Sequence, residues 1–142
     1  MTYAKSMPSD SQRLARSVVH LTRRLRQERH TELTPTQLAV LSTVMVMGPA
    51  TPGAIAAREK VRPPSVTRTI NCLVDDGYVL REPHPDDRRQ VLVRLSDKGE
   101  ALLAEERQRR NAWLDGRLST LTVEERATLR EASELLERLA SE

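Results

Sequence analysis

The sequence predicts a mainly α-helical fold that carries one small β-hairpin. Several stretches have the signals of helices, because apolar residues recur in them every three or four positions and capping residues or prolines precede them. Two short runs rich in β-branched and apolar residues, 78–82 and 91–95, are separated only by polar residues and prolines. A short helix joined directly to a hairpin with arginines at its tip is typical of a winged helix-turn-helix.

The first and the last predicted helices each carry a narrow apolar stripe. The first begins at Ser9 or Asp10 and runs to about Arg29, and its stripe consists of Leu14, Val18, Leu21 and Leu25. The last begins at a capping box, 122–125, and its stripe consists of Leu129, Ala132, Leu136 and Leu139. Such stripes exceed what a small core can cover, so we expect them to pack against a second copy of the chain.

Three helices are predicted in the middle of the chain, each with proline at its first turn. Their starting signals are Thr34-Pro35, Thr51-Pro52 and Arg62-Pro63-Pro64. Their expected ends are Gly48, Glu59 and Gly77. After the hairpin, Ser96-Asp97 caps a long helix from about 98 to 118. We therefore expect residues 34–96 to form the winged helix-turn-helix, and residues 1–33 with 97–142 to form a helical dimerisation region.

The helix predicted at 64–76 has two faces of different chemistry. Its apolar residues fall on one side, which is expected to face the core: Val66, Ile70, Leu73 and Val74. The other side is small and polar, and the candidate DNA contacts there are Pro64, Ser65, Thr67, Arg68 and Thr69. Because a recognition helix enters the major groove by its N-terminal end, Arg68 is placed to pair with a guanine edge. An ordinary solvated helix face is the alternative, and the hairpin that follows favours DNA binding.

The loop between the two predicted strands contains the other candidate DNA contacts, Asp87, Arg88 and Arg89. An exposed tip with two arginines suits the minor groove, where a narrow groove focuses negative potential. A carboxylate can accept hydrogen bonds from a neighbouring guanidinium and hold it in one geometry, which gives the aspartate a role. A charge-balanced, soluble turn is the alternative.

The segment P-D-D-R-R-Q-V-L-V-R-L-S-D-K-G resembles the wing signature of the MarR family of bacterial transcriptional regulators. The family pattern is D-x-R, an apolar run, L-[ST] and then x-x-G, which corresponds here to Asp87, Arg89, 91–95, Ser96 and Gly99. The segment V-T-R-T-I-N-C-L-V-D-D-G-Y-V resembles the family's recognition helix and first wing strand, and L-T-P-T-Q-L-A-V-L resembles its second helix. The resemblance covers essentially the whole chain in order and spacing.

The resemblance implies a homodimer in which helices from both termini interlock. It implies that Arg89, helped by Arg88, reaches the minor groove with Asp87 orienting it. Two recognition helices would bind a near-palindromic operator with half-sites about one helical turn apart. The implied function is that of a repressor released by a small-molecule effector. The alternatives are an activator, an architectural DNA-binding protein, or a winged helix used for protein contacts, which would predict an apolar outward face.

Other kinds of site have weaker support in the sequence. An effector site has weak candidates in Arg16, His20 and Trp113, although a lone tryptophan is more often a packing anchor. The single cysteine, Cys72, lies on the predicted DNA face, and a tolerated small residue is favoured over a redox sensor. The three histidines are scattered, so no metal is expected. No cofactor or enzymatic activity is expected, since no phosphate-binding loop or nucleophile elbow is present.

Composition narrows the class of protein. Charged residues make up 30% of the chain and hydrophobic residues 38%, which is typical of a globular protein. No apolar run approaches the roughly 20 residues that a membrane-spanning helix needs, and residues 1–8 have no apolar core of a signal peptide. The single cysteine suits a reducing compartment. These features predict a cytoplasmic protein whose partners are double-stranded DNA and a second copy of the chain, with no membrane partner.

Overall fold

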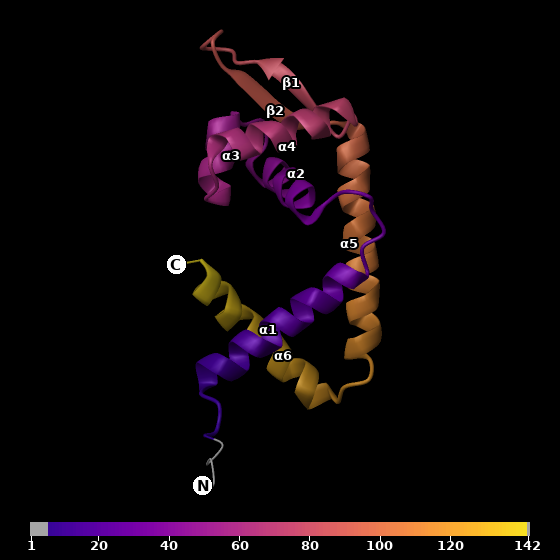
Figure 1. The fold of residues 1–142 in the computed structure, drawn as a ribbon. Coiled ribbons are helices and arrows are strands. Elements are labelled where there is room, and N and C mark those ends of the chain that lie inside the picture. The colour runs from indigo at the N-terminus through magenta and orange to yellow at the C-terminus, as the bar shows by residue number, and fades with distance from the viewer. Residues whose placement is uncertain (1–5, 142) are drawn as a thin grey trace, which may run out of the picture. The chain divides into compact units, whose positions relative to one another are not determined.

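The computed structural model describes residues 6–141, and in this part of the chain it has helices and one antiparallel hairpin (Figure 1). The elements in chain order are α1 (Asp10–Gln27), α2 (Pro35–Met47), α3 (Pro52–Glu59), α4 (Pro63–Asp75), β1 (Val79–Pro83), β2 (Val91–Leu95), α5 (Asp97–Leu118) and α6 (Val123–Ala140). The predicted fold class, mainly α with a small β-hairpin wing, is therefore confirmed. The chain divides into two compact units: residues 30–107, and the residues up to 29 together with those from 108 onward.

The unit of residues 30–107 has one apolar core, formed by α2, α3, α4, the hairpin and the start of α5. Its fully buried large side chains are Leu41, Val44, Ile55, Val66, Ile70, Leu73, Val79 and Val93. The helices begin where capping chemistry requires, because the side chains of Thr34 and Thr51 accept hydrogen bonds from Gln37 N–H and Ala54 N–H. Local capping thus sets where the helices start, and burial of their apolar sides joins them.

The hairpin pairs β1 with β2 in a register that places Val79 opposite Leu95 and Pro83 opposite Val91. The second strand has the predicted bounds, and the first begins one residue later than the predicted 78–82. A single residue before α3 adds an unpredicted bridge to β2: Ala50 N–H donates to Val93 O at 3.0 Å, and Val93 N–H donates to Ala50 O at 2.8 Å. One residue has no periodicity, so no sequence pattern could indicate this pairing.

The junction between the hairpin and α5 is closely packed around Gly99. A Cβ placed on this glycine would lie 2.2 Å from the carbonyl oxygen of Tyr78. The same carbonyl accepts a hydrogen bond from Ser96 N–H at 3.1 Å, while Ser96 Oγ accepts from Gly99 N–H at 3.1 Å. Gly77, with φ of 80°, turns the chain from α4 into β1. The end of α4, the hairpin and α5 are therefore joined through backbone contacts that leave no room for a side chain at position 99.

The second unit contains α1, α6 and the end of α5, and neither α1 nor α6 has a buried residue. Both helices have complete capping boxes, at Ser9 with Gln12 and at Thr122 with Glu125. Their predicted stripes remain open to solvent in the single chain, as shown by the exposed fractions of Leu14 (43%), Leu21 (48%), Leu129 (46%), Leu136 (39%) and Leu139 (66%). Leu25 and Ala132 are half-buried, so the single chain forms these helices without fully burying their apolar sides.

No helix between residues 6 and 141 is long and apolar enough to cross a membrane.

Candidate nucleic-acid interface

The recognition helix predicted from the sequence is α4, which follows α3 after a three-residue turn. It packs against α2, α3 and β1 through Val66, Ile70 and Leu73, which are all buried. The turn begins at Lys60, which adopts a left-handed conformation with φ of 55°. Helix α4 therefore has one side anchored in the core, and the side with the candidate DNA contacts faces outward.

The candidate contacts on α4 lie together on this outward side. Pro64, Ser65, Thr67 and Arg68 are exposed, and Thr69 is half-buried. The hydroxyls of Thr67 and Thr69 donate to the backbone carbonyls of Pro63 and Ser65, at 3.0 and 3.1 Å. Their hydroxyl oxygens can still accept a hydrogen bond. The guanidinium of Arg68 has no hydrogen-bond or ion-pair partner within residues 6–141, so all its donors are available to a base or a phosphate.

The wing tip is ordered by a histidine at its base. His84 Nδ1 accepts hydrogen bonds from the backbone N–H groups of Asp86 and Asp87, both at 3.1 Å. The loop closes where His84 N–H donates to Gln90 O at 3.2 Å and Gln90 N–H donates to Asp87 O at 3.0 Å. The sequence does not indicate this role for His84, since no spacing rule marks a histidine as the acceptor of a turn. The wing loop is therefore a hydrogen-bonded turn.

Asp87 contacts the backbone of the wing, whereas a contact with an arginine side chain was expected. Its Oδ1 accepts a hydrogen bond from the backbone N–H of Arg89 at 3.0 Å, whereas a bond to a guanidinium was expected. This contact is an Asx-type turn, which the side chain of an aspartate forms readily with the N–H two residues on. Arg88 and Arg89 are exposed. Asp87 thus shapes the backbone at the tip and leaves the guanidinium of Arg89 free to reach outward.

Two further arginines lie on the hairpin strands, and neither was singled out from the sequence. Nη2 of Arg81, on β1, donates to Oδ1 of Asn71 on α4. Nε of Arg94, on β2, forms an ion pair with the carboxylate of Glu82. No local pattern links Asn71 to Arg81, because the chain leaves the helix and turns at Gly77 between them. The contact between Arg81 and Asn71 requires the hairpin to fold against α4, whereas the ion pair between Arg94 and Glu82 joins the two strands within the hairpin.

The weak effector candidates, Arg16, His20 and Trp113, all lie in the second unit, on α1 and α5. Trp113 is half-buried, and its ring lies 5.5 Å from the Arg24 guanidinium carbon and 5.2 Å from that of Arg117. Arg16 and His20 are exposed on α1. Such cation–π contacts give the ring an anchoring role within its own unit.

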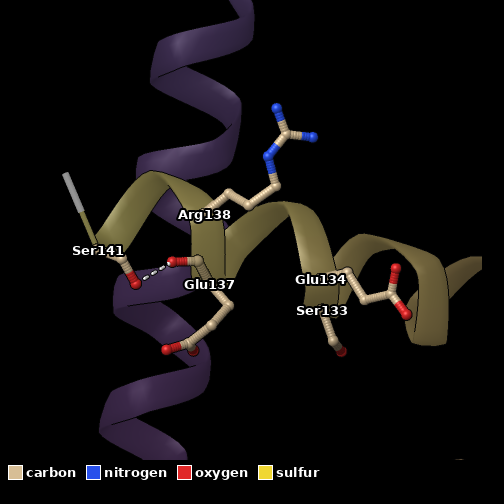
Figure 2. Close-up of a pocket in the computed structure, with 5 residues that line it drawn as sticks. All are labelled: Ser133, Glu134, Glu137, Arg138 and Ser141. Atoms are coloured by element: carbon tan, nitrogen blue, oxygen red, sulfur yellow. Dashed lines mark hydrogen bonds between the residues drawn. The ribbon is translucent and has the colours of Figure 1, made fainter.

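A shallow pocket of about 540 Å³ lies at the end of α6 and is lined by Ser133, Glu134, Glu137, Arg138 and Ser141, none of which is an effector candidate. Figure 2 shows the side chains of Arg138 and Glu137 extending to opposite sides of the helix, so they do not converge on a ligand. The hydroxyl of Ser141 donates to the Glu137 carbonyl at 2.8 Å, which ties the last turn together. Among residues 6–141 no three metal-ligating side chains cluster.

A pocket of about 500 Å³ lies within the winged-helix unit, and Glu32, Gln37, Tyr78 and Lys98 help to line it. Lys98 occupies one wall of this pocket: its Nζ donates to the Asp76 carbonyl at 2.6 Å and lies 4.4 Å from the centre of the Tyr78 ring. The ammonium group is thus already held by two partners of the chain itself. This pocket contains none of the predicted site residues.

Comparison with known proteins identifies the family of the chain. The sequence model of the MarR family matches residues 33–91, which contain α2, α3, α4, β1, the wing loop and all the candidate DNA contacts. An uncharacterised HTH-type transcriptional regulator of Mycobacterium leprae is 45% identical over 130 residues, which cover 91% of each protein. The multiple antibiotic resistance protein MarR of Salmonella typhimurium is 34% identical over 99 residues, which cover 69% of each protein.

The fold agrees with solved structures of the same family. The apo form of wild-type MarR from E. coli superposes with a TM-score of 0.75 at 26% identity, and the match covers 92% of this chain and 98% of that one. The matched region includes the helices outside the winged helix-turn-helix, so the similarity extends beyond the DNA-binding unit. The chain belongs to the MarR family and is a DNA-binding transcriptional regulator rather than an enzyme.

Proposed function

We propose that this protein is a homodimeric repressor that binds a near-palindromic operator and is released by a small-molecule effector. The observation that carries the proposal is the pairing, in one unit, of a polar outward face on α4 with an ordered wing that presents Arg88 and Arg89. In such a pair the helix can enter the major groove and the wing can enter the minor groove. The polar outward face counts against a winged helix used for protein contacts.

The dimer is supported by the uncovered apolar stripes of α1 and α6. A second copy presents the same stripes, and a symmetric pair of helices buries both at once. We therefore assign residues 1–33 and 97–142 to dimerisation and residues 34–96 to DNA binding, with 1–5 and 142 outside the described residues. A two-fold dimer presents two copies of α4, so its operator is a near-palindrome with half-sites about one helical turn apart.

Repression requires only that the dimer occupies a promoter. The dimerisation region and the DNA-binding region together are enough for this. The dimer can adopt conformations that differ in the spacing of the two α4 helices. An effector that binds more tightly to a conformation with the wrong spacing for DNA would shift the dimer away from the DNA-binding form. Arg16, His20 and Trp113 remain the candidates for such a site, in the unit that forms the dimer. The protein acts where the DNA is, so we expect it in the cytoplasm. An activator or architectural role is the second candidate function.

The test is selection of duplexes from a random pool with the full chain, followed by fluorescence anisotropy with unrelated duplex as competitor. Recovery of a two-fold symmetric sequence that binds with two protomers and resists the competitor supports the proposal. Recovery of a single, asymmetric half-site would overturn the dimeric part. A reporter gene placed behind the selected sequence then gives the sign of regulation: expression that rises when the protein is supplied would replace repression by activation.

Replacing Arg68 by alanine is expected to relax base preference at one position in each half-site. The side chain is exposed, has no partner among residues 6–141 and lies close to the N-terminal end of α4, and a bidentate pair with guanine contributes about 1–3 kcal/mol of discrimination. Anisotropy titrations against the selected duplex and single-base variants measure the loss. An unchanged ranking of the variant duplexes would contradict a base contact for Arg68.

Replacing Arg89 by alanine is expected to weaken binding to all duplexes alike. The guanidinium lies at the tip of a turn held by Asp87 and His84, and it contributes charge rather than a base-specific pair. The slope of log affinity against log salt should fall in magnitude by about 0.9 for each protomer bound. Arg130→Ala, an exposed change on α6, removes the same charge outside the winged helix and serves as the control. If Arg89→Ala keeps the full salt slope, the wing does not contact DNA.

A further inference from the structure

Arg81 lies on β1 between the recognition helix and the wing. We propose that it is a further DNA-binding residue, which contacts the phosphate backbone where this passes from the major groove at α4 to the minor groove at the wing, and that Asn71 is its positioning residue. The proposal rests on the DNA binding of the family, and is independent of repression and of any effector.

The hairpin register explains where Arg81 points. Residues opposite one another in an antiparallel pair project from the same face. Arg81 lies opposite Val93, and Val79, two residues earlier on the same face, lies opposite Leu95. Val79, Val93 and Leu95 are buried in the core, whereas Arg81 is exposed. Arg81 therefore lies on the same side of β1 as the buried Val79, but beyond the edge of the core. Its guanidinium extends to α4.

On α4, the partner of Arg81 belongs to the candidate DNA-binding face. Nη2 of Arg81 donates to Oδ1 of Asn71, which follows Thr67 by four residues and Arg68 by three. Residues three and four apart are neighbours on a helix surface, and Thr67, Arg68 and Asn71 are all exposed. The guanidinium of Arg81 is thus held within one helical turn of the residues proposed to enter the major groove.

The charge of Arg81 is uncompensated by this contact. An amide oxygen is neutral, so Arg81 keeps its full positive charge, whereas Arg94 on the neighbouring strand is paired with the carboxylate of Glu82. A guanidinium has five N–H donors, and the bond to Asn71 leaves others for phosphate oxygens. An exposed contact of this kind contributes little to folding, because water competes for both partners. Orientation of a cation toward DNA is the use that the geometry favours.

The test measures affinity for a duplex selected with the unmodified full chain, and for a random-sequence duplex of equal length, over a series of potassium chloride concentrations. Arg81→Gln is expected to lower affinity for both duplexes roughly tenfold at low salt and to reduce the salt slope by about 0.9 for each protomer bound. Arg81→Lys, which keeps the charge, should retain the slope. Arg130→Gln removes the same charge on α6 and should change neither quantity. An unchanged slope in Arg81→Gln, with thermal unfolding like that of the unmodified protein, overturns the proposal.

The role of Asn71 is separated from that of Arg81 by a double-mutant cycle. Asn71→Ala is expected to weaken binding several-fold in the unmodified chain, without changing the order of preference among duplexes. In the Arg81→Gln background the same substitution should have no further effect, because nothing remains to be positioned. An equal loss in both backgrounds, or a changed base preference, would mean that Asn71 contacts DNA itself and would overturn its positioning role.

Discussion

Replacing Leu129 by glutamate is expected to convert the dimer into monomers and to abolish operator binding at concentrations where the unmodified protein binds. Leu129 lies on the apolar stripe of α6 and is 46% exposed in the single chain. In a symmetric dimer two copies lose their burial at once, on the order of 3 kcal/mol in all before the cost of burying the charge. The dimer dissociation constant should therefore rise at least about 100-fold, which sedimentation velocity over a dilution series measures.

Arg130→Glu introduces the same side chain one position along α6, away from the stripe, and should leave the dimer intact. A chain ending at Leu121 should behave like Leu129→Glu, because it lacks α6 entirely. Circular dichroism checks that the helices of the winged-helix unit are still folded in each variant. A fully dimeric Leu129→Glu protein, or a monomeric truncation that still binds the operator with undiminished affinity, would contradict dimerisation through the terminal helices.

Replacing Gly99 by alanine is expected to destabilise the winged-helix unit by about 3 kcal/mol, the upper part of the range for overpacking. The added Cβ would lie 2.2 Å from the Tyr78 carbonyl oxygen and 3.4 Å from Cδ2 of Leu95. The Tyr78 backbone cannot retreat freely, because its N–H donates to Leu73 O at 2.9 Å and its carbonyl accepts from Ser96 N–H at 3.1 Å. Thermal unfolding followed by circular dichroism measures the loss as a lower midpoint.

Gly116 is the matched control in the same helix. A Cβ at Gly116 meets nothing within 4 Å, so Gly116→Ala should leave the midpoint unchanged or raise it, as helix propensity favours alanine by about 1 kcal/mol. Equal midpoints for the two alanine variants would show that the contact between positions 78 and 99 relaxes without cost. The expected contrast explains why the family signature ends in glycine, which otherwise lowers helix stability.

Local chemistry made most of the elements predictable. The starts of α1, α2, α3 and α6 depend on hydrogen bonds between residues three positions apart, so the capping residues alone indicate them. The two faces of α4 follow from helical periodicity, and the structure buries Val66, Ile70 and Leu73 as expected. The roles of the outward residues in DNA binding remain predictions, because burial and geometry place these side chains without identifying what they bind.

Contacts between elements were less predictable. Asp87 was expected to bond to a neighbouring guanidinium, and in the structure it accepts a hydrogen bond from the Arg89 backbone N–H, which an Asx-type turn provides. Neither the residue type nor the position of His84 indicated a structural role. In the structure it accepts two backbone hydrogen bonds that shape the wing loop. The bridge at Ala50 had no signal at all.

The sequence by itself determined the helices, the hairpin and the family, and it predicted the surface that meets DNA, because each depends on periodicity, capping or a contiguous motif. Only the tertiary structure decided the close contact at Gly99, the register of the hairpin against the core and the position of Arg81 beside Asn71. These contacts join residues that lie on different elements. Their geometry depends on how a shared core packs, and no short stretch of the chain encodes that.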